Sequence, residues 1–219
     1  MTEQRKRRAY SSGLRQEHAQ ATRMKIATAA RDLMAAKGYA GTTMAEVARE
    51  AGVAVQTLYT SCPGGKPALA KLVYDITLAG DAQAVPQSDR PEVQAIVDEP
   101  DPARKLARYA AMATAILRRV GPVHRLLRAA AAASPADAGL HDVLAGIERE
   151  RLAGGRGLAE HLHALGASRP GLSTGRAAEQ IYVLTSAENF EKLTEVCGWS
   201  EADYEEWLAL MLAAALLGT

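Results

Sequence analysis

The chain has 219 residues, a net charge of +1 and few aromatic residues, and this length fits one large domain or two small ones. With only two cysteines, Cys62 and Cys197, a disulfide framework is excluded. No apolar run is long enough to cross a bilayer, and no apolar segment follows the basic start as in a signal peptide, so we expect a soluble, cytoplasmic protein without a membrane partner.

The nearly neutral total hides a division of charge along the chain. Residues 1–66 carry 11 lysines and arginines against 5 aspartates and glutamates, whereas residues 67–219 carry 15 against 20. Basic side chains that neutralise phosphates release counterions from DNA, but the charge alone fits a solvated surface equally well. The segment 1–21, which includes Arg5 to Arg8, is predicted to be a basic, flexible arm that either reaches DNA or makes no contact.

Two helices are predicted directly after this arm. Apolar residues at helical spacing predict the first over residues 22–37, ended by Gly38. The pair Thr43 and Glu46 has the spacing of a capping box, which predicts the start of the second helix. Its end is predicted at Gly52, because glycine tolerates the left-handed backbone of a helix C-cap.

A third short helix is predicted from Val55 to Ser61, with Leu58 facing inward and polar side chains facing outward. Two short helices joined by a glycine-containing turn form a helix-turn-helix. We therefore predict a DNA-binding module over residues 22–66 of an all-α protein.

This stretch resembles the DNA-binding domain of the TetR family of transcriptional regulators. The likeness covers about residues 22–75 and rests on four features in order: the helix over 23–37, the helix Thr43–Ala51, the turn at Gly52, and Thr57-Leu58-Tyr59 followed by a lysine. It implies a three-helix DNA-binding domain, a larger helical domain for effector binding and dimerisation, and double-stranded DNA as the partner.

The expected DNA contacts come from the start of the second helix and from the third. Gln56 has the side chain for a bidentate contact to adenine, and the methyl groups of Val55 and Thr57 suit thymine. The Tyr59 hydroxyl is expected to reach a phosphate, with simple packing as the alternative. The predicted set is Thr42, Thr43, Val55, Gln56, Thr57, Tyr59, Thr60, Ser61 and Lys66.

The remaining residues, 67–219, are predicted to form one larger helical domain. The helix over 66–80, which Gly80 is predicted to end, connects it to the DNA-binding module. A proline-containing linker follows over residues 81–100 and includes a short helical piece. The next helix begins after Asp101 and is predicted to break at Gly121-Pro122. A later helix is predicted to be interrupted at Gly154, Gly155 and Gly157, which mark either a kink or a close contact.

Two final helices are predicted over residues 174–196 and 201–217, and Ser200 and Asp203 form a capping pair at the start of the second. The last one is apolar on all sides, which indicates burial on all sides. A second subunit is one way to cover it, and its own domain is the other; the resemblance favours a dimer interface built from this pair. The predicted interface residues are Ile181, Leu184, Phe190, Leu208, Met211, Leu212 and Leu216.

The resemblance also implies a pocket for a small effector in the C-terminal domain. The predicted lining is Tyr109, Met112, Ile116, His124, Leu126 and Tyr182, which favours a mostly apolar ligand. The alternative is that the many alanines nearby pack tightly and leave no pocket.

No catalytic, cofactor or metal site is predicted: His161 and His163 point apart on a helix, and the glycines at 154–157 lack a preceding strand. The expected function is that of a homodimeric repressor, released from a palindromic operator by an effector. The alternatives are a constitutive regulator or activator without an effector and, less supported by the sequence, an all-helical enzyme.

Overall fold

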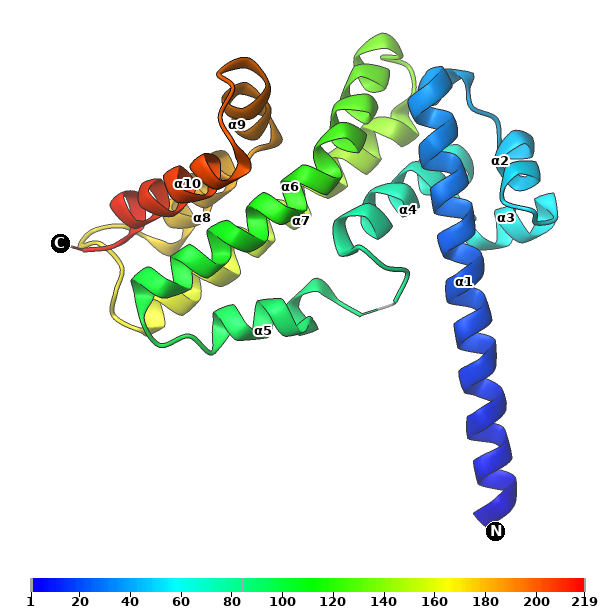
Figure 1. Ribbon diagram of the computed structural model, residues 1–219, viewed down its shortest axis with the longest axis horizontal. Coiled ribbons are helices and arrows are strands. Elements are labelled where there is room, and N and C mark those ends of the chain that lie inside the picture. The colour runs from blue at the N-terminus through cyan, green and yellow to red at the C-terminus, as the bar shows by residue number, and fades with distance from the viewer. Residues whose placement is uncertain (1, 84, 219) are drawn as a thin grey trace. The chain divides into compact units, whose positions relative to one another are not determined.

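The computed structural model describes the backbone of residues 2–83 and 85–218, and the side chains of these residues except 2–16. Over these ranges every regular element is a helix, which confirms the all-α prediction (Figure 1). The elements in chain order are α1 (Thr2–Gly41), α2 (Met44–Glu50), α3 (Val55–Ser61), α4 (Gly65–Ala79), the 3-10 turn η1 (Gln87–Asp89), α5 (Pro91–Val97), α6 (Pro102–Ala133), α7 (Ala138–Ala164), α8 (Thr174–Leu184), α9 (Ala187–Glu191), the π-helical turn η2 (Lys192–Val196) and α10 (Glu201–Leu216).

These helices form two compact units. Unit 1 contains residues 1–84 and 123–143, and unit 2 contains residues 85–122 and 144–219. The division crosses α6 directly after Pro122. Helix α1 begins well before Thr22, where the apolar pattern predicts it, because the polar residues ahead of it include many good helix formers. The side chains of Arg5 to Arg8, in the predicted arm, lie outside the described residues.

Unit 1 begins with the predicted helix-turn-helix. Helix α1 is interrupted at Gly38, whose φ of 73° is left-handed. The predicted capping box is confirmed: the Glu46 amide donates to Thr43 Oγ1 over 3.2 Å, and the Thr43 amide donates to Glu46 Oε2 over 3.1 Å. The turn between α2 and α3 is confirmed at Gly52, which has a φ of 65°. Figure 1 shows α2 and α3 beside the C-terminal end of α1.

The core of unit 1 joins α1 to α4. Ile26, Ala30 and Met34 of α1 are buried, and so are Leu69 and Val73 of α4. These residues recur at helical spacing on their two helices, so each helix presents one apolar stripe to the other. The predicted end of α4 is confirmed at Gly80, where a left-handed glycine forms the C-cap.

Two predicted breaks in the long helices are wrong. Helix α6 continues through Pro122, whose ring lies on the exposed face, where solvent can bind the carbonyl that loses its hydrogen-bond donor. The buried neighbours Val120 and Val123 hold the helix on either side. Helix α7 continues through Gly154 and Gly155 without interruption, because helix packing offsets the low helix propensity of glycine.

The helix predicted over residues 174–196 is instead divided at Thr185 and Ser186. Ser186 caps α9, and its hydroxyl accepts from the Asn189 amide over 3.3 Å. Side chains from elsewhere bind the carbonyl groups that the break releases: Arg151 donates to Tyr182 and Thr185. Figure 1 shows α9 turning away from the line of α8.

The core of unit 2 is formed by α6, α7, α8 and α10, with Ile96 of α5 at its edge. Figure 1 shows α8 and α10 side by side. The predicted capping box of α10 is confirmed at Ser200 and Asp203. The buried residues of this core are Ile96, Leu106, Ala110, Ala113, Leu117, Leu158, Ala159, Leu162, Ala177, Ile181, Ala187, Tyr204, Leu208, Leu212 and Leu216.

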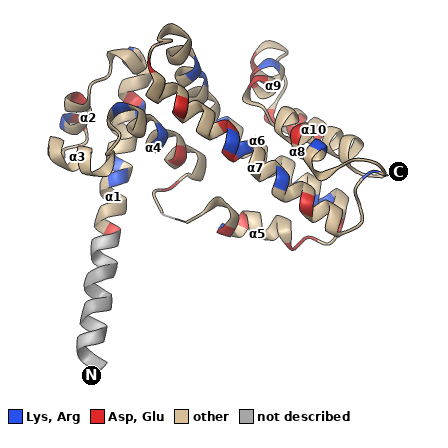
Figure 2. Ribbon diagram, turned by 180° about the vertical axis from the view of Figure 1, so that it is seen from behind, with Lys and Arg blue, Asp and Glu red and all other residues tan. Residues whose placement is uncertain are grey.

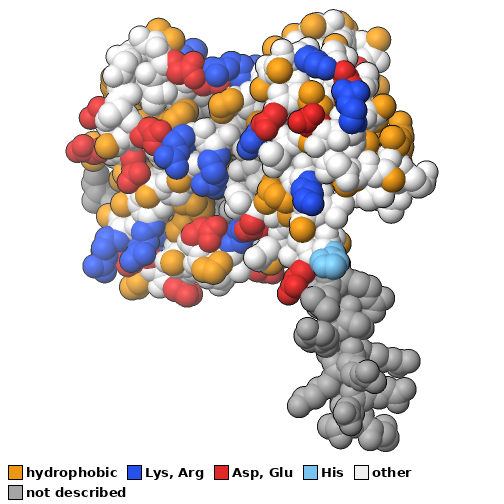
Figure 3. All heavy atoms as spheres, turned by 45° about the vertical axis from the view of Figure 1, so that its right-hand side comes forward, with side chains coloured by type: hydrophobic (Ala, Val, Ile, Leu, Met, Phe, Trp, Pro, Cys, Tyr) orange, Lys and Arg blue, Asp and Glu red, His pale blue; other side chains and the backbone are white. Residues whose placement is uncertain are grey.

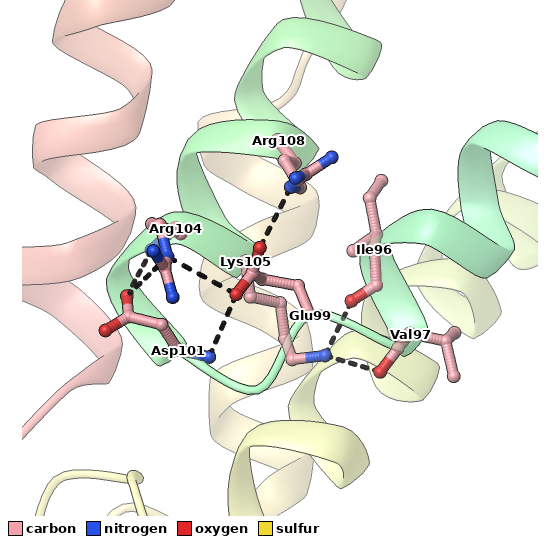
Figure 4. Close-up of polar contacts among 7 residues, drawn as sticks. All are labelled: Ile96, Val97, Glu99, Asp101, Arg104, Lys105 and Arg108. Atoms are coloured by element: carbon pink, nitrogen blue, oxygen red, sulfur yellow. Dashed lines mark hydrogen bonds and ion pairs between the residues drawn. The ribbon is translucent and has the colours of Figure 1, made fainter.

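A buried lysine fastens α5 to α6. The Lys105 ammonium donates to the carbonyl oxygens of Ile96 over 2.6 Å and Val97 over 2.8 Å, at the C-terminal end of α5 (Figure 4). Burial lowers the pKa of Lys105, and the charge of Glu99 opposes this. Glu99 in turn accepts from the Arg108 guanidinium over 3.1 Å. The cation lies where the partial negative charge of a helix end stabilises it.

Candidate DNA-binding surface

Helix α3 is held to unit 1 by a single buried side chain. Leu58 is 0% exposed, and it is the only buried residue of the seven in this helix. Gln56 and Thr57 are exposed, and Val55 and Tyr59 are 45% and 46% exposed. A helix anchored by one apolar residue presents nearly its whole circumference to solvent, as insertion into a DNA groove requires.

The hydrogen-bonding groups on α3 are not all free. Among the described residues, the side chains of Gln56 and Thr57 make no hydrogen bond, whereas the Thr60 hydroxyl donates to the Gln56 carbonyl over 2.9 Å. Ser61 is partly exposed, and Cys62, the C-cap, is buried with its thiol pKa raised by burial. The amide side chain of Gln56 is therefore the group on this face best suited to a bidentate base contact.

The two threonines before α2 have separate roles. Thr42 is buried, and its hydroxyl donates to the Gly38 carbonyl over 2.9 Å, so its side chain closes the end of α1. The Thr43 hydroxyl is used in the capping box and also donates to Glu46 Oε2 over 3.0 Å. We therefore leave Thr42 out of the proposed contacts and keep Thr43.

Lys66 lies within unit 1 in a defined position. Its ammonium donates to the Ala40 carbonyl over 3.0 Å and lies 4.5 Å from the centre of the Tyr39 ring. Burial lowers its pKa, and the negative charge of Asp137 opposes this. The Lys66 ammonium, which was predicted to contact a phosphate, is thus bound by groups of its own chain.

Sequence reasoning missed two basic residues near this surface. Lys37 forms an ion pair with Glu46 over 2.6 Å at the start of α2. Arg23 is exposed on α1, and its positive charge opposes the rise that burial causes in the pKa of the Cys62 thiol, at the C-cap of α3. Neither is near α3 in sequence, so no local pattern indicates them. The blue segments of the ribbon in Figure 2 mark lysine and arginine positions on α1 and α4.

The residues predicted for a dimer interface fall into two groups. Ile181, Leu208, Leu212 and Leu216 are at most 1% exposed within the single chain, so they cannot meet a partner and belong to the core of unit 2. Leu184 and Phe190 are partly buried against that core. Only Met211, at 37%, is clearly exposed, and the neighbouring Leu210 is 59% exposed.

The residues predicted for an effector site divide between the two units. Tyr109, Met112, Ile116 and Tyr182 belong to unit 2, whereas His124 and Leu126 belong to unit 1. Tyr109 and Met112 pack against the core of unit 2. The Tyr182 hydroxyl donates to Glu148 Oε2 over 2.8 Å. Its ring lies 4.8 Å from the Arg151 guanidinium, a charged neighbour that the sequence analysis did not expect.

The described residues contain no group of three or more His, Cys, Asp or Glu side chains suited to holding a metal ion. Within the same residues, no helix combines the length and apolar character needed to cross a membrane. In the view of Figure 3 the surface carries basic and acidic side chains interspersed with apolar ones.

Comparisons with known proteins agree with this geometry. Residues 26–62 match the family model for bacterial regulatory proteins of the tetR family. This segment contains α2, α3 and the buried part of α1 that supports them. No curated protein sequence matches the chain significantly.

Solved structures share the fold along nearly the whole chain. A TetR-family regulator from Rhodococcus sp. has a TM-score of 0.68 at 16% identity, covering 90% of this chain and 98% of its own. One from Mesorhizobium loti has a TM-score of 0.63 at 21% identity, covering 90% and 95%. The regulator FadR from Bacillus subtilis, solved with stearoyl-CoA, has a TM-score of 0.66 at 18% identity, covering 86% and 96%.

The family model accounts for the helix-turn-helix, and the solved structures account for the arrangement of helices beyond it. Both belong to regulators of transcription, which are not enzymes. Residues 26–62 therefore match the DNA-binding domain of tetR-family regulators, and the chain as a whole shares the fold of solved TetR-family transcriptional regulators.

Proposed function

We propose that two copies of this chain bind a palindromic DNA operator and repress transcription from it. The observation that carries the proposal is the exposure of α3, which is anchored by Leu58 alone. Two such helices related by a two-fold axis enter successive major grooves when they are about 34–36 Å apart. The division of labour is then DNA binding by residues 22–66 and control and dimerisation by residues 67–219, in the cytoplasm.

The proposed base-reading residues are Val55, Gln56 and Thr57, all exposed on the first turn of α3. Gln56 offers a donor and an acceptor to adenine, and the two methyl-bearing side chains suit thymine. Tyr59 and Thr43 are the proposed phosphate contacts. Thr60 and Ser61, further along α3, are proposed to follow the backbone of the DNA.

The proposed dimer surface is the outer face of α10. Trp207 is partly exposed, and Leu210, Met211 and Ala214 are exposed at helical spacing on one side of the helix. A stripe of this kind exposes apolar area that a second copy would remove from water. This surface replaces the buried residues of α8 and α10 that the sequence suggested.

The proposed effector is a small, mostly apolar molecule bound in unit 2 near Tyr109, Met112, Ile116 and Tyr182. Support comes from the apolar character of these residues and from a fold relative solved with stearoyl-CoA, an amphipathic ligand. Such a ligand releases the operator only if it binds the DNA-free arrangement more tightly than the DNA-bound one.

A footprint on the DNA upstream of the protein's own gene tests the proposal. We expect protection of two related half-sites on one face of the duplex, with affinity that falls steeply as salt rises. Protection of a single half-site, or of random duplex equally well, would contradict the dimeric operator complex. Ligands that stabilise the free protein against heat are then added: release of the footprint supports the effector, whereas binding without release favours a regulator that needs none.

A further inference from the structure

Lys66 lies at the start of α4, directly after the helix-turn-helix. It is the second residue of α4, and its ammonium donates to the carbonyl of Ala40, near the end of α1, over 3.0 Å. The chain between these two residues contains both α2 and α3 with their turns. One side-chain contact therefore joins the segment that enters the helix-turn-helix to the segment that leaves it.

The surroundings of the ammonium are fixed. The Tyr39 ring, 4.5 Å from Lys66 Nζ, is only 4% exposed and so cannot move freely. A cation over an aromatic face is attracted by the ring quadrupole. The carbonyl partner, Ala40, lies in the short stretch of α1 that follows the break at Gly38. A hydrogen bond and a cation–π contact therefore hold the ammonium in this place.

The backbone next to Lys66 makes the contact possible. Gly65 has a φ of 66°, a left-handed backbone that favours glycine, and its amide donates to the Cys62 carbonyl over 2.9 Å. This tight turn follows α3 directly and leads straight into the residue that binds α1. A change at Lys66 is thus transmitted to the end of α3 through only four intervening residues.

A phosphate contact would compete with these partners. To reach DNA, the ammonium would have to leave the Ala40 carbonyl and the face of a buried ring. A direct contact of that kind removes one charge from the DNA interface when mutated, so the salt dependence of binding falls. If Lys66 only orients α3, its mutation lowers base discrimination and leaves the salt dependence of DNA binding unchanged.

We propose that Lys66 is a positioning residue: with Tyr39 and Ala40 it clamps the two ends of the helix-turn-helix and so sets the orientation of α3. The proposal rests on the proposed use of α3 as the base-reading helix. It assigns the effect of Lys66 to the geometry of unit 1 rather than to a bond with phosphate.

Hydrogen exchange in the free protein tests the clamp without DNA. Lys66→Met removes the ammonium and keeps an unbranched side chain. We expect the amides of α2 and α3 to exchange about tenfold faster than in the wild type, while those of α10 in unit 2 are unchanged. Lys66→Arg, which keeps a cation for the ring and the carbonyl, should restore most of the protection. Wild-type exchange in Lys66→Met would overturn the clamp.

Binding to operator and to random duplex, each over a range of salt, tests the consequence. Lys66→Met is expected to lose about tenfold in operator affinity and little in random-duplex affinity, with the wild-type salt slope. Equal losses on both duplexes, with a slope reduced by about one, would show a phosphate contact instead. A wild type without operator preference would refute the proposed function, and the exchange experiment would still decide the clamp.

Discussion

Gly155 of α7 lies directly against Ala178 of α8, and a methyl group at Gly155 would stand 3.2 Å from the Ala178 carbonyl oxygen and 3.3 Å from Ile181 Cγ2. Ala178 and Ile181 are both buried. The absence of a side chain at Gly155 is therefore what lets α7 and α8 approach within unit 2.

Substitution of the two adjacent glycines by alanine should have opposite effects. Gly154 is exposed with nothing within 4 Å of an added methyl group, so Gly154→Ala should stabilise the helix by up to about 1 kcal/mol. Gly155→Ala should destabilise by about 1–3 kcal/mol, because the crowded groups belong to a packed helix that cannot retreat. Urea unfolding of both variants measures the difference, and equal stabilities would contradict the close contact.

Arg151 should contribute much more to stability than an arginine in an exposed pair. Its side chain is 18% exposed, binds Glu148 over 2.7 Å and donates to the carbonyls of Tyr182 and Thr185. Arg151→Met leaves the carbonyls of Tyr182 and Thr185 without this donor, while Glu148 keeps the Tyr182 hydroxyl, and we expect a loss of about 1–3 kcal/mol.

The matched control is Arg176→Met. Arg176 is paired with Glu179 over 2.8 Å, but both side chains are more than half exposed, so the expected change is below about 1 kcal/mol. Thermal unfolding monitored by circular dichroism compares the two variants. A similar shift in both would show that the contacts of Arg151 with α8 contribute nothing of their own.

The stability of the helix-turn-helix should depend on Glu46 at acidic pH. The Lys37 ammonium, and then the Thr43 amide and hydroxyl, lower the pKa of Glu46 from 4.5 to about 2. Because the pKa is lower in the folded protein, the contribution is fully present above about pH 4.5 and is lost as the pH falls toward 2. Glu46→Gln should remove this part of the acid sensitivity, as followed by unfolding between pH 6 and 2. An unchanged profile would contradict the assignment.

An aspartate on the exposed side of α10 should prevent assembly, whereas an aspartate on its buried side should prevent folding. Leu210 is 59% exposed, so Leu210→Asp should yield a folded monomer by light scattering and circular dichroism. Leu212 is 0% exposed, so Leu212→Asp should unfold unit 2 itself. A dimeric Leu210→Asp variant would place the interface elsewhere.

Features with short-range causes were predicted well from the sequence. The capping boxes at Thr43 and Ser200 and the left-handed glycines at Gly52 and Gly80 depend on residues within one helical turn, and all are present. The exposed face of α3 follows in the same way from Leu58, the only residue of this helix that is buried.

Features that depend on distant partners were not predicted. The break after α8 is stabilised by Arg151, 31 and 34 residues before its two carbonyl acceptors. The partners of Lys66 lie before α2, so no local sequence pattern indicates its position in unit 1. The burial of Leu212 depends on which side of an all-apolar helix faces its own core, and periodicity does not distinguish these sides.

The measurement that tests the central claim most directly is the affinity of Gln56→Ala for the operator and for versions of it changed at single base pairs. If α3 reads the major groove, the variant should lose about 1–3 kcal/mol on the operator and no longer discriminate at one base pair per half-site, with discrimination elsewhere and the salt slope unchanged. Retention of the full wild-type base preference by Gln56→Ala would contradict the account, because the side chain best placed to read a base on α3 would then read none.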